Sequence, residues 1–210
     1  MSEDDATSNT ALSVPGLPRP LRWLVPAPRV EVTGAGALRV EAGPRSDWFI
    51  DPGADTVVRN APALVMPASG PWQLSAVVWA DHRATFDAGV LFVHVDDVTW
   101  AKLCLELSPQ GEVMVVSVVT RGTSDDCNSL PVEGHSLHLR VSALERAFAF
   151  HWSPDGQAWH LVRYFSLGDG APSAAGVGFM AQSPTGEGCT VEFADVTFRS
   201  ELLAELRAGD

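Results

Sequence analysis

Short β-rich runs, separated at nearly regular intervals by turn residues, are the feature that most constrains the fold of this chain. From about residue 20, stretches rich in Val, Leu, Phe and Trp alternate with clusters of Gly, Pro, Asp and Ser. Strands that recur every 8–12 residues or so, about a dozen in all, are typical of an antiparallel sandwich or barrel. We expect strands at 38–40, 47–50, 63–66, 72–79, 89–95, 99–107, 113–120, 135–142, 147–153, 159–165, 175–181 and 190–199.

Turn sequences support hairpins between these strands. Ser-Pro-Asp-Gly at 153–156 and Ser-Pro-Gln-Gly at 108–111 each separate two β-rich runs. Strands do not alternate with helical patterns, which argues against a parallel sheet, and no internal repeat indicates a propeller. The run 191–198 alternates on both sides of an expected kink near Ala194 and Asp195. Such alternation suits an antiparallel sheet with one buried face.

Length and composition favour one large all-β domain. With 210 residues, of which 46% are hydrophobic, the chain is long enough to bury a single core. Residues 1–20 are acidic and then proline-rich, so we expect a flexible segment ahead of a β-sandwich at 21–199. Only residues 200–207 have helical spacing, so 200–210 are expected to form a short C-terminal helix or tail.

Charge and cysteine content exclude several classes of partner. The net charge of −12, with only 14 basic residues, leaves no footprint for nucleic acid and would repel an anionic membrane. No apolar run approaches the roughly 20 residues of a membrane helix, and the N-terminus lacks the pattern of a secretory signal. Cys104, Cys127 and Cys189 form no C-x-x-C pair, so neither a metal nor a cofactor is expected. These features favour a cytoplasmic protein with free thiols.

The only lysine of the chain, Lys102, marks the strongest candidate site. Side chains alternate between the faces of a strand, so 99–107 has an apolar face of Ala101, Leu103, Leu105 and Leu107 and an opposite face of Trp100, Lys102, Cys104 and Glu106. Lys102 would bind a carboxylate, a phosphate or a sugar hydroxyl, with Trp100 as a stacking wall and Glu106 as a further polar contact. The structural alternative is an ion pair with Glu106 or Asp87, because a buried lysine is retained only when paired.

Two residues outside this strand would contribute from neighbouring strand ends. Asp87, in the turn before Gly89, either fixes a ligand hydroxyl beside Lys102 or caps backbone N–H groups. Trp79, at the end of the run 72–79, is the expected second stacking wall, although core packing is the commoner role of a tryptophan.

Other polar residues would extend the site at its rim. Arg121, Ser124 and Asp125 lie in an expected polar loop after the strand 113–120, and loops at strand ends often bind ligands. Arg140 shares a strand face with His138, and Gln182 ends the strand 175–181, so both could point into the same groove.

Several motifs, taken in order, resemble one family. They are Ser-Asp-Trp-Phe (46–49), Phe-Asp-Ala-Gly-Val-Leu-Phe (86–92), Asp-Asp-Val-Thr-Trp-Ala-Lys-Leu-Cys-Leu-Glu (96–106), Val-Val-Thr-Arg-Gly-Thr-Ser-Asp (118–125), Leu-His-Leu-Arg (137–140), Trp-Ser-Pro-Asp-Gly-Gln-Ala-Trp (152–159) and Gly-Phe-Met-Ala-Gln-Ser-Pro-Thr-Gly-Glu-Gly-Cys (178–189). Over residues 45–199 the chain resembles the domain-of-unknown-function family typed by the regulation-of-enolase protein, within the concanavalin A-like lectin/glucanase superfamily.

The resemblance implies a jelly-roll sandwich of a convex and a concave sheet, and carbohydrate association as a superfamily expectation. It implies no particular reaction. The family pattern often places a tryptophan after the Ser-Asp of 124–125, whereas this chain has Asp126 there. A ligand that stacked on that tryptophan would therefore be bound differently here.

The sequence leaves the activity open. The Glu-x-Asp-x-x-Glu pattern of laminarinase-like relatives is absent, and so are a nucleophile elbow and a phosphate-binding glycine loop. We expect a saccharide or small sugar-derived ligand to bind in the concave groove. The alternatives are a carbohydrate-active enzyme using Glu106 and Asp87, and a protein-interaction module that regulates metabolism. Exposed edge strands would also allow a homodimer.

Overall fold

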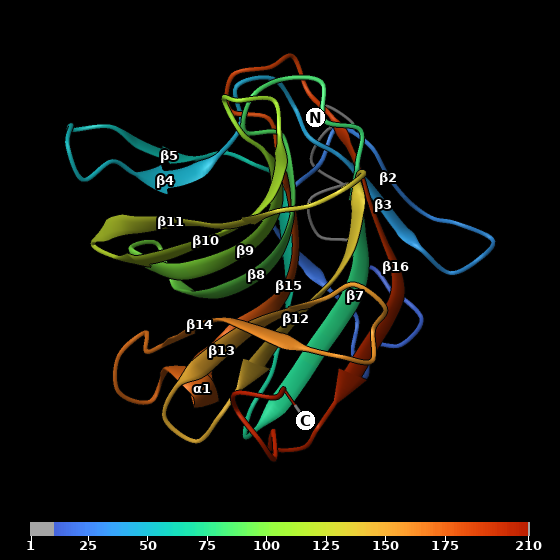
Figure 1. The fold of residues 1–210 in the computed structure, drawn as a ribbon, viewed down its shortest axis with the longest axis vertical. Coiled ribbons are helices and arrows are strands. Elements are labelled where there is room, and N and C mark those ends of the chain that lie inside the picture. Colours follow the sequence, from blue (N-terminus) through green and yellow to red (C-terminus); the bar gives the residue numbers. More distant parts are fainter. Residues whose placement is uncertain (1–10, 210) are drawn as a thin grey trace, which may run out of the picture.

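Two seven-stranded antiparallel sheets pack against each other in the computed structural model, which describes residues 11–209 (Figure 1). The first, here called the groove sheet, has the order β1 (Arg22–Val25), β6 (Ala63–Pro67), β15 (Gly176–Gln182), β8 (Ala88–Asp96), β9 (Thr99–Leu107), β10 (Val113–Arg121) and β11 (Thr123–Pro131). The second, the back sheet, has the order β14 (His160–Phe165), β13 (Phe148–Ser153), β12 (Ser136–Ala143), β7 (Trp72–Ala80), β16 (Thr190–Arg199), β3 (Leu38–Glu41) and β2 (Val30–Val32). This arrangement confirms the predicted all-β, concanavalin A-like sandwich.

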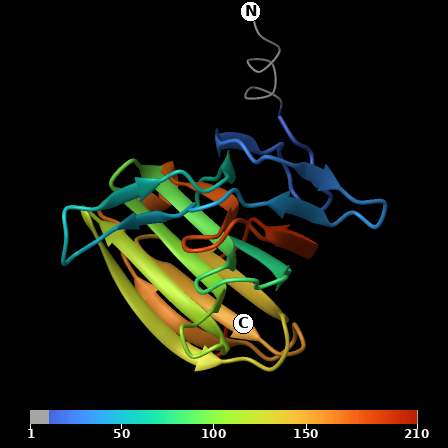
Figure 2. The same ribbon diagram turned by 90° about the horizontal axis from the view of Figure 1, so that it is seen from above.

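A separate hairpin of β4 (Trp48–Ile50) and β5 (Val57–Arg59) belongs to neither large sheet. Figure 1 shows this hairpin on the same side of the molecule as β10 and β11, and Figure 2 shows it in cyan from above. It covers part of the groove sheet, because the Trp48 ring packs edge-on against Phe92 and Trp100, with 5.2 Å between ring centroids in each pair. The backbone N–H of Ile50 also donates to the Ser124 hydroxyl over 2.9 Å.

The apolar layer between the two sheets follows the alternation of their strands. On β9, Ala101, Leu103 and Leu105 are completely buried in this layer, as the period-two pattern predicts. A second apolar cluster lies on the opposite face of the groove sheet, beneath the hairpin, and includes Trp100 and Cys104. The groove sheet is therefore covered on both faces near β4, and exposed to solvent only beyond it.

All twelve expected strands are present within one or two residues of their predicted ends, but four strands were not predicted: β1, β2, β5 and β11. Strand β11 is the instructive case, because residues 123–131 are polar and were expected to form a loop. They pair along β10 from Arg121–Thr123 to Met114–Pro131 and form the edge of the groove sheet. Most of their side chains are exposed, and a polar composition is what an edge strand tolerates.

The predicted turns and the predicted kink are confirmed. The turns at 108–111 and 153–156 connect β9 to β10 and β13 to β14, with Gly111 and Gly156 at φ +79° and +74°. In β16 the pairing with β7 shifts register between Ala194 and Thr197, and Asp195 has φ +50°. This bulge bends the closing strand where the sequence predicted it.

The two ends of the described chain differ from the predictions. Residues 200–209 contain no helix; instead they lie against the back sheet, where Leu203 is buried and the Leu206 carbonyl accepts a bond of 2.9 Å from His151 Nε2. Packing of one apolar face on a sheet has replaced the helix that the spacing predicted. Residues 1–10 lie outside the described part, but Val14 is buried, so residues 11–20 pack on the core instead of forming a flexible tail.

The described residues form a single short helix, α1 (Ala171–Ala174). None of the helical structure in residues 11–209 is long and apolar enough to cross a membrane.

Candidate functional site

A pocket of about 260 Å³ opens on the groove sheet beside the β4–β5 hairpin. Its lining combines charged, amide and aromatic side chains from six segments of the chain: Asp47, Phe49, Phe86, Lys102, Glu106, Val118, Asp126, Gln182, Pro184 and Thr185. A concave site with apolar walls and a few convergent polar groups is the usual form of a small-molecule site.

Lys102 occupies the buried base of this pocket, with only 2% of its surface exposed. Its ammonium group donates to Asp47 Oδ1 over 2.9 Å and to Gln182 Oε1 over 3.0 Å. The Phe49 ring lies 5.9 Å from the same nitrogen. An ammonium group has three donors, and among residues 11–209 no acceptor takes the third. Lys102 therefore has one ammonium N–H that can donate to a ligand in the pocket.

The ion-pair partner of Lys102 is Asp47, not Glu106 or Asp87 as the structural alternative expected. Asp47 precedes β4 and is held there by its neighbours. Its backbone N–H donates to the Asn60 side chain over 2.9 Å, and the next residue, Trp48, donates its N–H to Asp47 Oδ1 over 2.7 Å. Ser46 also pairs with Ser183 through two backbone bonds of 3.0 and 3.1 Å, which joins the hairpin to the end of β15.

Glu106 lies four residues beyond Lys102 on the same face of β9 and is 8% exposed. Its Oε2 atom accepts a bond of 3.2 Å from Gln182 Nε2, which also donates to the Phe86 carbonyl over 3.1 Å. Burial raises the pKa of Glu106 to about 8, although the nearby Lys102 charge acts in the opposite direction. Glu106 therefore carries a proton at neutral pH.

The pKa values of Lys102 and Asp126 are shifted by burial and by the charges of the same pocket. Burial alone would lower the pKa of Lys102, but the Asp47 carboxylate and its hydrogen bond, together with Cys104 and Glu106, hold this pKa above its ordinary value. Asp126 lies at the outer rim on β11, in register with Val118 and, through it, with Lys102. Loss of surrounding water raises the pKa of Asp126, with Lys102 opposing this. Directly opposite residues share a face, so these groups look into one space.

Phe86 forms a wall of the pocket in a constrained backbone conformation. Its φ of +70° lies in the left-handed region, which a bulky side chain seldom adopts. The loop before β8 holds it there: Phe86 N–H donates to the Leu107 carbonyl over 2.7 Å, and both Arg83 and Ala84 donate their N–H groups to Asp87 Oδ2. Such strain costs about 1–3 kcal/mol and persists only where the surrounding structure imposes it.

Asp87 is therefore a turn residue and does not line the pocket. Besides the two backbone bonds, its Oδ1 accepts a bond of 2.6 Å from the Ser183 hydroxyl, and the side chain is completely buried. Asp81, Asp87 and Cys189 also bring their ligand atoms within 4.8 Å of one another. Asp81 accepts from the Thr190 N–H, and burial raises the pKa of the Cys189 thiol well above its usual range, so this cluster has the chemistry of a structural network.

The structure corrects the placement of three predicted site residues. Trp100 points to the groove face but is completely buried beneath Trp48, so it cannot stack on a ligand. Trp79 is 38% exposed on the back sheet, far from Lys102 in the topology. Arg140 also belongs to the back sheet, where it donates to the Gly209 carbonyl and lies 4.1 Å from the Trp159 ring centroid.

The predicted rim residues are divided between several roles. Ser124 is buried and supports the hairpin through Ile50, with its hydroxyl 2.9 Å from that of Thr120. Asp125 points to the other side of β11, where it forms a 2.7 Å ion pair with Arg163 of β14. Arg121 is exposed at the end of β10 and is not part of the pocket lining. Of the predicted residues, the pocket unites Lys102, Glu106 and Gln182.

Sequence reasoning missed Asp47, Phe49, Phe86, Val118, Asp126, Pro184 and Thr185 as pocket residues. Six of them stood in motifs that were noticed for other reasons, and the seventh, Asp126, was noted as the position where the family pattern often has tryptophan. A signal for Asp47 was available, because a buried lone lysine requires an acidic partner.

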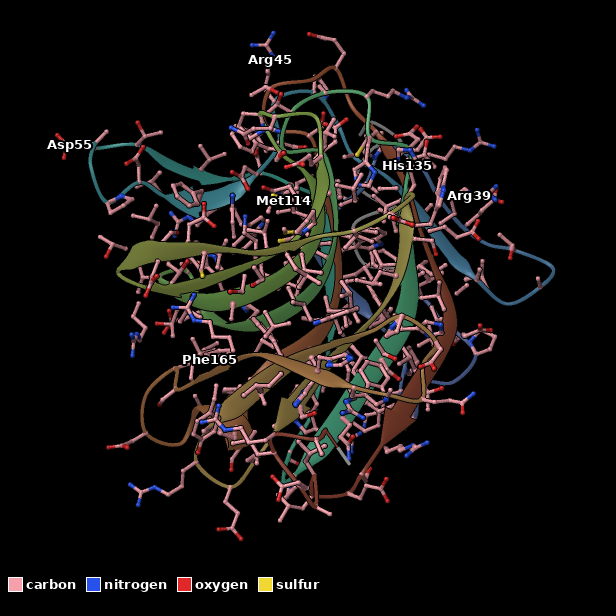
Figure 3. The ribbon with its side chains drawn as sticks, viewed as in Figure 1. Arg39, Arg45, Asp55, Met114, His135 and Phe165 are labelled. Carbon is pink, nitrogen blue, oxygen red and sulfur yellow. The ribbon has the colours of Figure 1, made fainter. Side chains whose placement is uncertain are left out.

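A second hollow, of about 310 Å³, lies on the back sheet and is lined by Trp79 together with paired charges. Arg39, labelled in Figure 3, lies 2.7 Å from Glu192 and 3.1 Å from Glu31. The charged side chains of this hollow already pair with one another on an exposed surface. The groove pocket instead has a buried lysine at its base, so it is the stronger candidate. Met114, labelled in the same figure, lies opposite Glu106 on β10 and packs against the apolar cluster under the hairpin.

Solved structures with the same fold were found by comparison. A functionally unknown protein from Saccharomyces cerevisiae is 24% identical with a TM-score of 0.78, covering 87% of this chain and 97% of that protein. Xylan beta-1,4-xylosidase from Bacillus halodurans C-125 is 16% identical with a TM-score of 0.62 over 78% of this chain, but this region is only 32% of the xylosidase. The alginate lyase from Klebsiella pneumoniae is 11% identical with a TM-score of 0.52, covering 81% and 83% of the two chains. At these identities the likeness shows the fold alone.

The family comparison covers most of the chain. The family described as "Protein of unknown function (DUF1349)" matches residues 23–201, which include every residue of the groove pocket and, except for Arg22, both sheets. No curated protein matches the chain.

Proposed function

The chain belongs to the family of proteins of unknown function DUF1349, and we propose that it binds a saccharide or a small sugar-derived molecule in the groove pocket. The observation that carries the proposal is the buried ammonium group of Lys102, which has a donor to spare at the base of a pocket with aromatic walls. Burying an ammonium group is costly, and Asp47 and Gln182 offset this cost while leaving one N–H available.

The walls of the pocket suit a ring with one apolar and several polar edges. Phe49 and Phe86 offer apolar surface, while Lys102, Glu106 and Gln182 offer donors and acceptors at the base. At neutral pH the protonated carboxyl group of Glu106 can both donate and accept a hydrogen bond, as sugar hydroxyls require. The volume of about 260 Å³ fits one or two sugar units better than a long buried chain.

Fold relatives whose names refer to xylan and alginate are consistent with a saccharide but do not establish it. The chemistry of the pocket is the stronger support. A cytoplasmic location and a homodimer stay predictions, because the pocket bears on neither.

The first test is binding of neutral mono- and disaccharides, measured by thermal shift and isothermal titration calorimetry. A ligand at 100 times its Kd stabilises the folded protein by about 2.7 kcal/mol. Phe49→Ala should weaken binding by about tenfold, because it removes one aromatic wall. Trp79→Ala on the back sheet is the matched aromatic control and should leave the affinity unchanged.

The proposal fails if the folded protein binds no saccharide of the panel, or if Phe49→Ala and Trp79→Ala behave alike. A stable complex recovered from lysate, without any response to small molecules, would instead favour the protein-interaction module.

A carbohydrate-active enzyme is the second candidate, and the protonation of Glu106 favours it. A carboxyl group that keeps its proton at neutral pH has the property required of a general acid. Its partner would have to be Asp126, because Asp87 is buried with both oxygens engaged. Glu106→Gln should then abolish turnover of any saccharide that is cleaved, and a fully active variant would exclude this role.

A further inference from the structure

Acidic groups outnumber basic groups in the lining of the groove pocket. Asp47, Glu106 and Asp126 contribute three carboxyl groups, whereas Lys102 contributes the single basic group of the lining. Three carboxyl groups less one ammonium group leave two acidic groups in excess. The Asp47 carboxylate already pairs with Lys102 at 2.9 Å, so the excess consists of Glu106 and Asp126.

Glu106 also has an unused oxygen inside the pocket. Its side chain is 8% exposed, and Oε2 accepts from Gln182, but no group in residues 11–209 donates to Oε1. Arg163, whose charge also acts on Asp126, is committed to the Asp125 carboxylate at 2.7 Å and to the Asp125 carbonyl at 3.2 Å. Within the described residues, therefore, Glu106 and Asp126 have no cation of their own.

We propose that the groove pocket selects a ligand carrying a primary ammonium group, such as an amino sugar, and that this group binds between Glu106 and Asp126. The inference rests on the proposed function, because it takes the same pocket as the saccharide site. An ammonium group would supply donors to the unused Glu106 oxygen and to the Asp126 carboxylate, and it would reduce the excess of acidic groups from two to one.

Binding of an ammonium group must be linked to the protonation of Glu106. At pH 7 the Glu106 carboxyl group holds a proton, because its pKa is about 8. A cation favours the carboxylate, so the proton leaves to solvent on binding, and the affinity rises as the pH approaches 8. The other groups that face Glu106 are Lys102 and Cys104 on β9, Asp126 on β11 and Asp47 before β4, and burial keeps the Cys104 thiol protonated by raising its pKa.

An anionic ligand should bind more weakly in the pocket than a cationic one. The free donor of Lys102 could meet one anionic oxygen, but the Asp47 carboxylate lies 2.9 Å from the same nitrogen. A sugar acid or sugar phosphate would therefore approach two or three carboxyl groups for the sake of one hydrogen bond.

The experiment compares four hexoses of similar size by isothermal titration calorimetry in phosphate buffer at pH 6, 7 and 8. They are 6-amino-6-deoxyglucose, its N-acetylated form, glucose and glucuronate. We expect the amine to bind about tenfold to a hundredfold more tightly than glucose at pH 8, which is the range of charged hydrogen bonds. The ratio should fall towards pH 6, and glucuronate should bind most weakly.

Two variants test the assigned residues. Glu106→Gln should reduce the ratio of amine to glucose affinity and abolish its dependence on pH, and Asp126→Asn should reduce the ratio. Glu112→Gln, on the exposed turn between β9 and β10, should change neither.

The outcomes separate the two proposals. If glucose and the amine bind equally at pH 8, saccharide binding stands and the ammonium preference is overturned. If the amine and ethanolamine bind but glucose does not, the ammonium site stands and the saccharide proposal fails. Failure of all four hexoses and ethanolamine to bind the folded protein overturns both.

Discussion

Both faces of strand β9 are buried, but the inner face is apolar from Ala101 to Leu107, whereas the groove face places Lys102 and Glu106 beside Trp100 and Cys104. Leu103 is completely buried between the sheets, and the preceding residue, Lys102, is only 2% exposed on the groove face. Leu103 needs only apolar neighbours, and any well-packed leucine or valine supplies them. Lys102 needs an acceptor at hydrogen-bonding distance, and the structure provides Asp47 and Gln182.

The difference teaches that burial has a different meaning on the two faces. On the inner face, burial itself is stabilising, at about 25 cal/mol per Å² of apolar surface. For Lys102 on the groove face, burial is tolerated only if its partners are in place, and they come from positions 55 and 80 residues away in the sequence. The groove face therefore depends on how the β4–β5 hairpin is attached.

The largest expected effect comes from removing the charge from the base of the groove. Lys102→Met should destabilise the protein by about 3–5 kcal/mol, because it leaves Asp47 and Gln182 without their partner. Leu103→Ala, on the other face, should cost about 2–5 kcal/mol through a cavity alone. Chemical denaturation measures both.

A double variant distinguishes the two causes. Asp47→Asn added to Lys102→Met should recover part of the loss, whereas it should add to the effect of Leu103→Ala. A Lys102→Met variant as stable as the wild type would show that the ion pair is dispensable.

The next effect is a dependence of stability on pH that only the groove face should cause. The folded pKa of Glu106 is about 8, against 4.5 for an exposed glutamate, so the folded state holds this proton more strongly than the unfolded state does. The stability associated with it is fully present below pH 4.5 and is lost as the pH rises to about 8, at about 1.4 kcal/mol per pH unit. Glu106→Gln should remove this slope and be more stable than the wild type at pH 8.

Denaturation curves at pH 5, 6, 7 and 8 provide the measurement, with the exposed Glu112→Gln as the matched control. Parallel pH profiles for the wild type and Glu106→Gln would contradict a buried, protonated Glu106.

The smallest effect concerns the attachment of the hairpin. Ser124→Ala leaves the buried N–H of Ile50 without its acceptor and should cost about 1–3 kcal/mol. The local consequence should be faster hydrogen exchange at Ile50 and Trp48 than at Leu103. Ser129→Ala, exposed on the same strand, is the control, and identical exchange in both variants would show that Ser124 does not hold the hairpin.

Local pattern was sufficient for the sandwich and for the inner face of β9. Period-two alternation and turn chemistry predicted twelve strands, two hairpin turns and the bend in β16, because each depends on a few adjacent residues. The prediction failed at β11, where a polar sequence gives no strand pattern. It also failed at residues 200–207, which have helical spacing but pack on the back sheet without forming a helix. In both places pairing or packing with a distant strand outweighed local preference.

By itself, the sequence determined that this chain forms an antiparallel β-sandwich and that Lys102 and Glu106 share one face of a strand. Only the tertiary structure decided what that face does. It covers Trp100 with Trp48, places Trp79 and Arg140 on the back sheet, and brings Asp47, Gln182 and Asp126 around Lys102 and Glu106. The physical reason is that alternation is a property of neighbouring residues, whereas the partners of a buried charge are chosen by which distant segments the two sheets bring together.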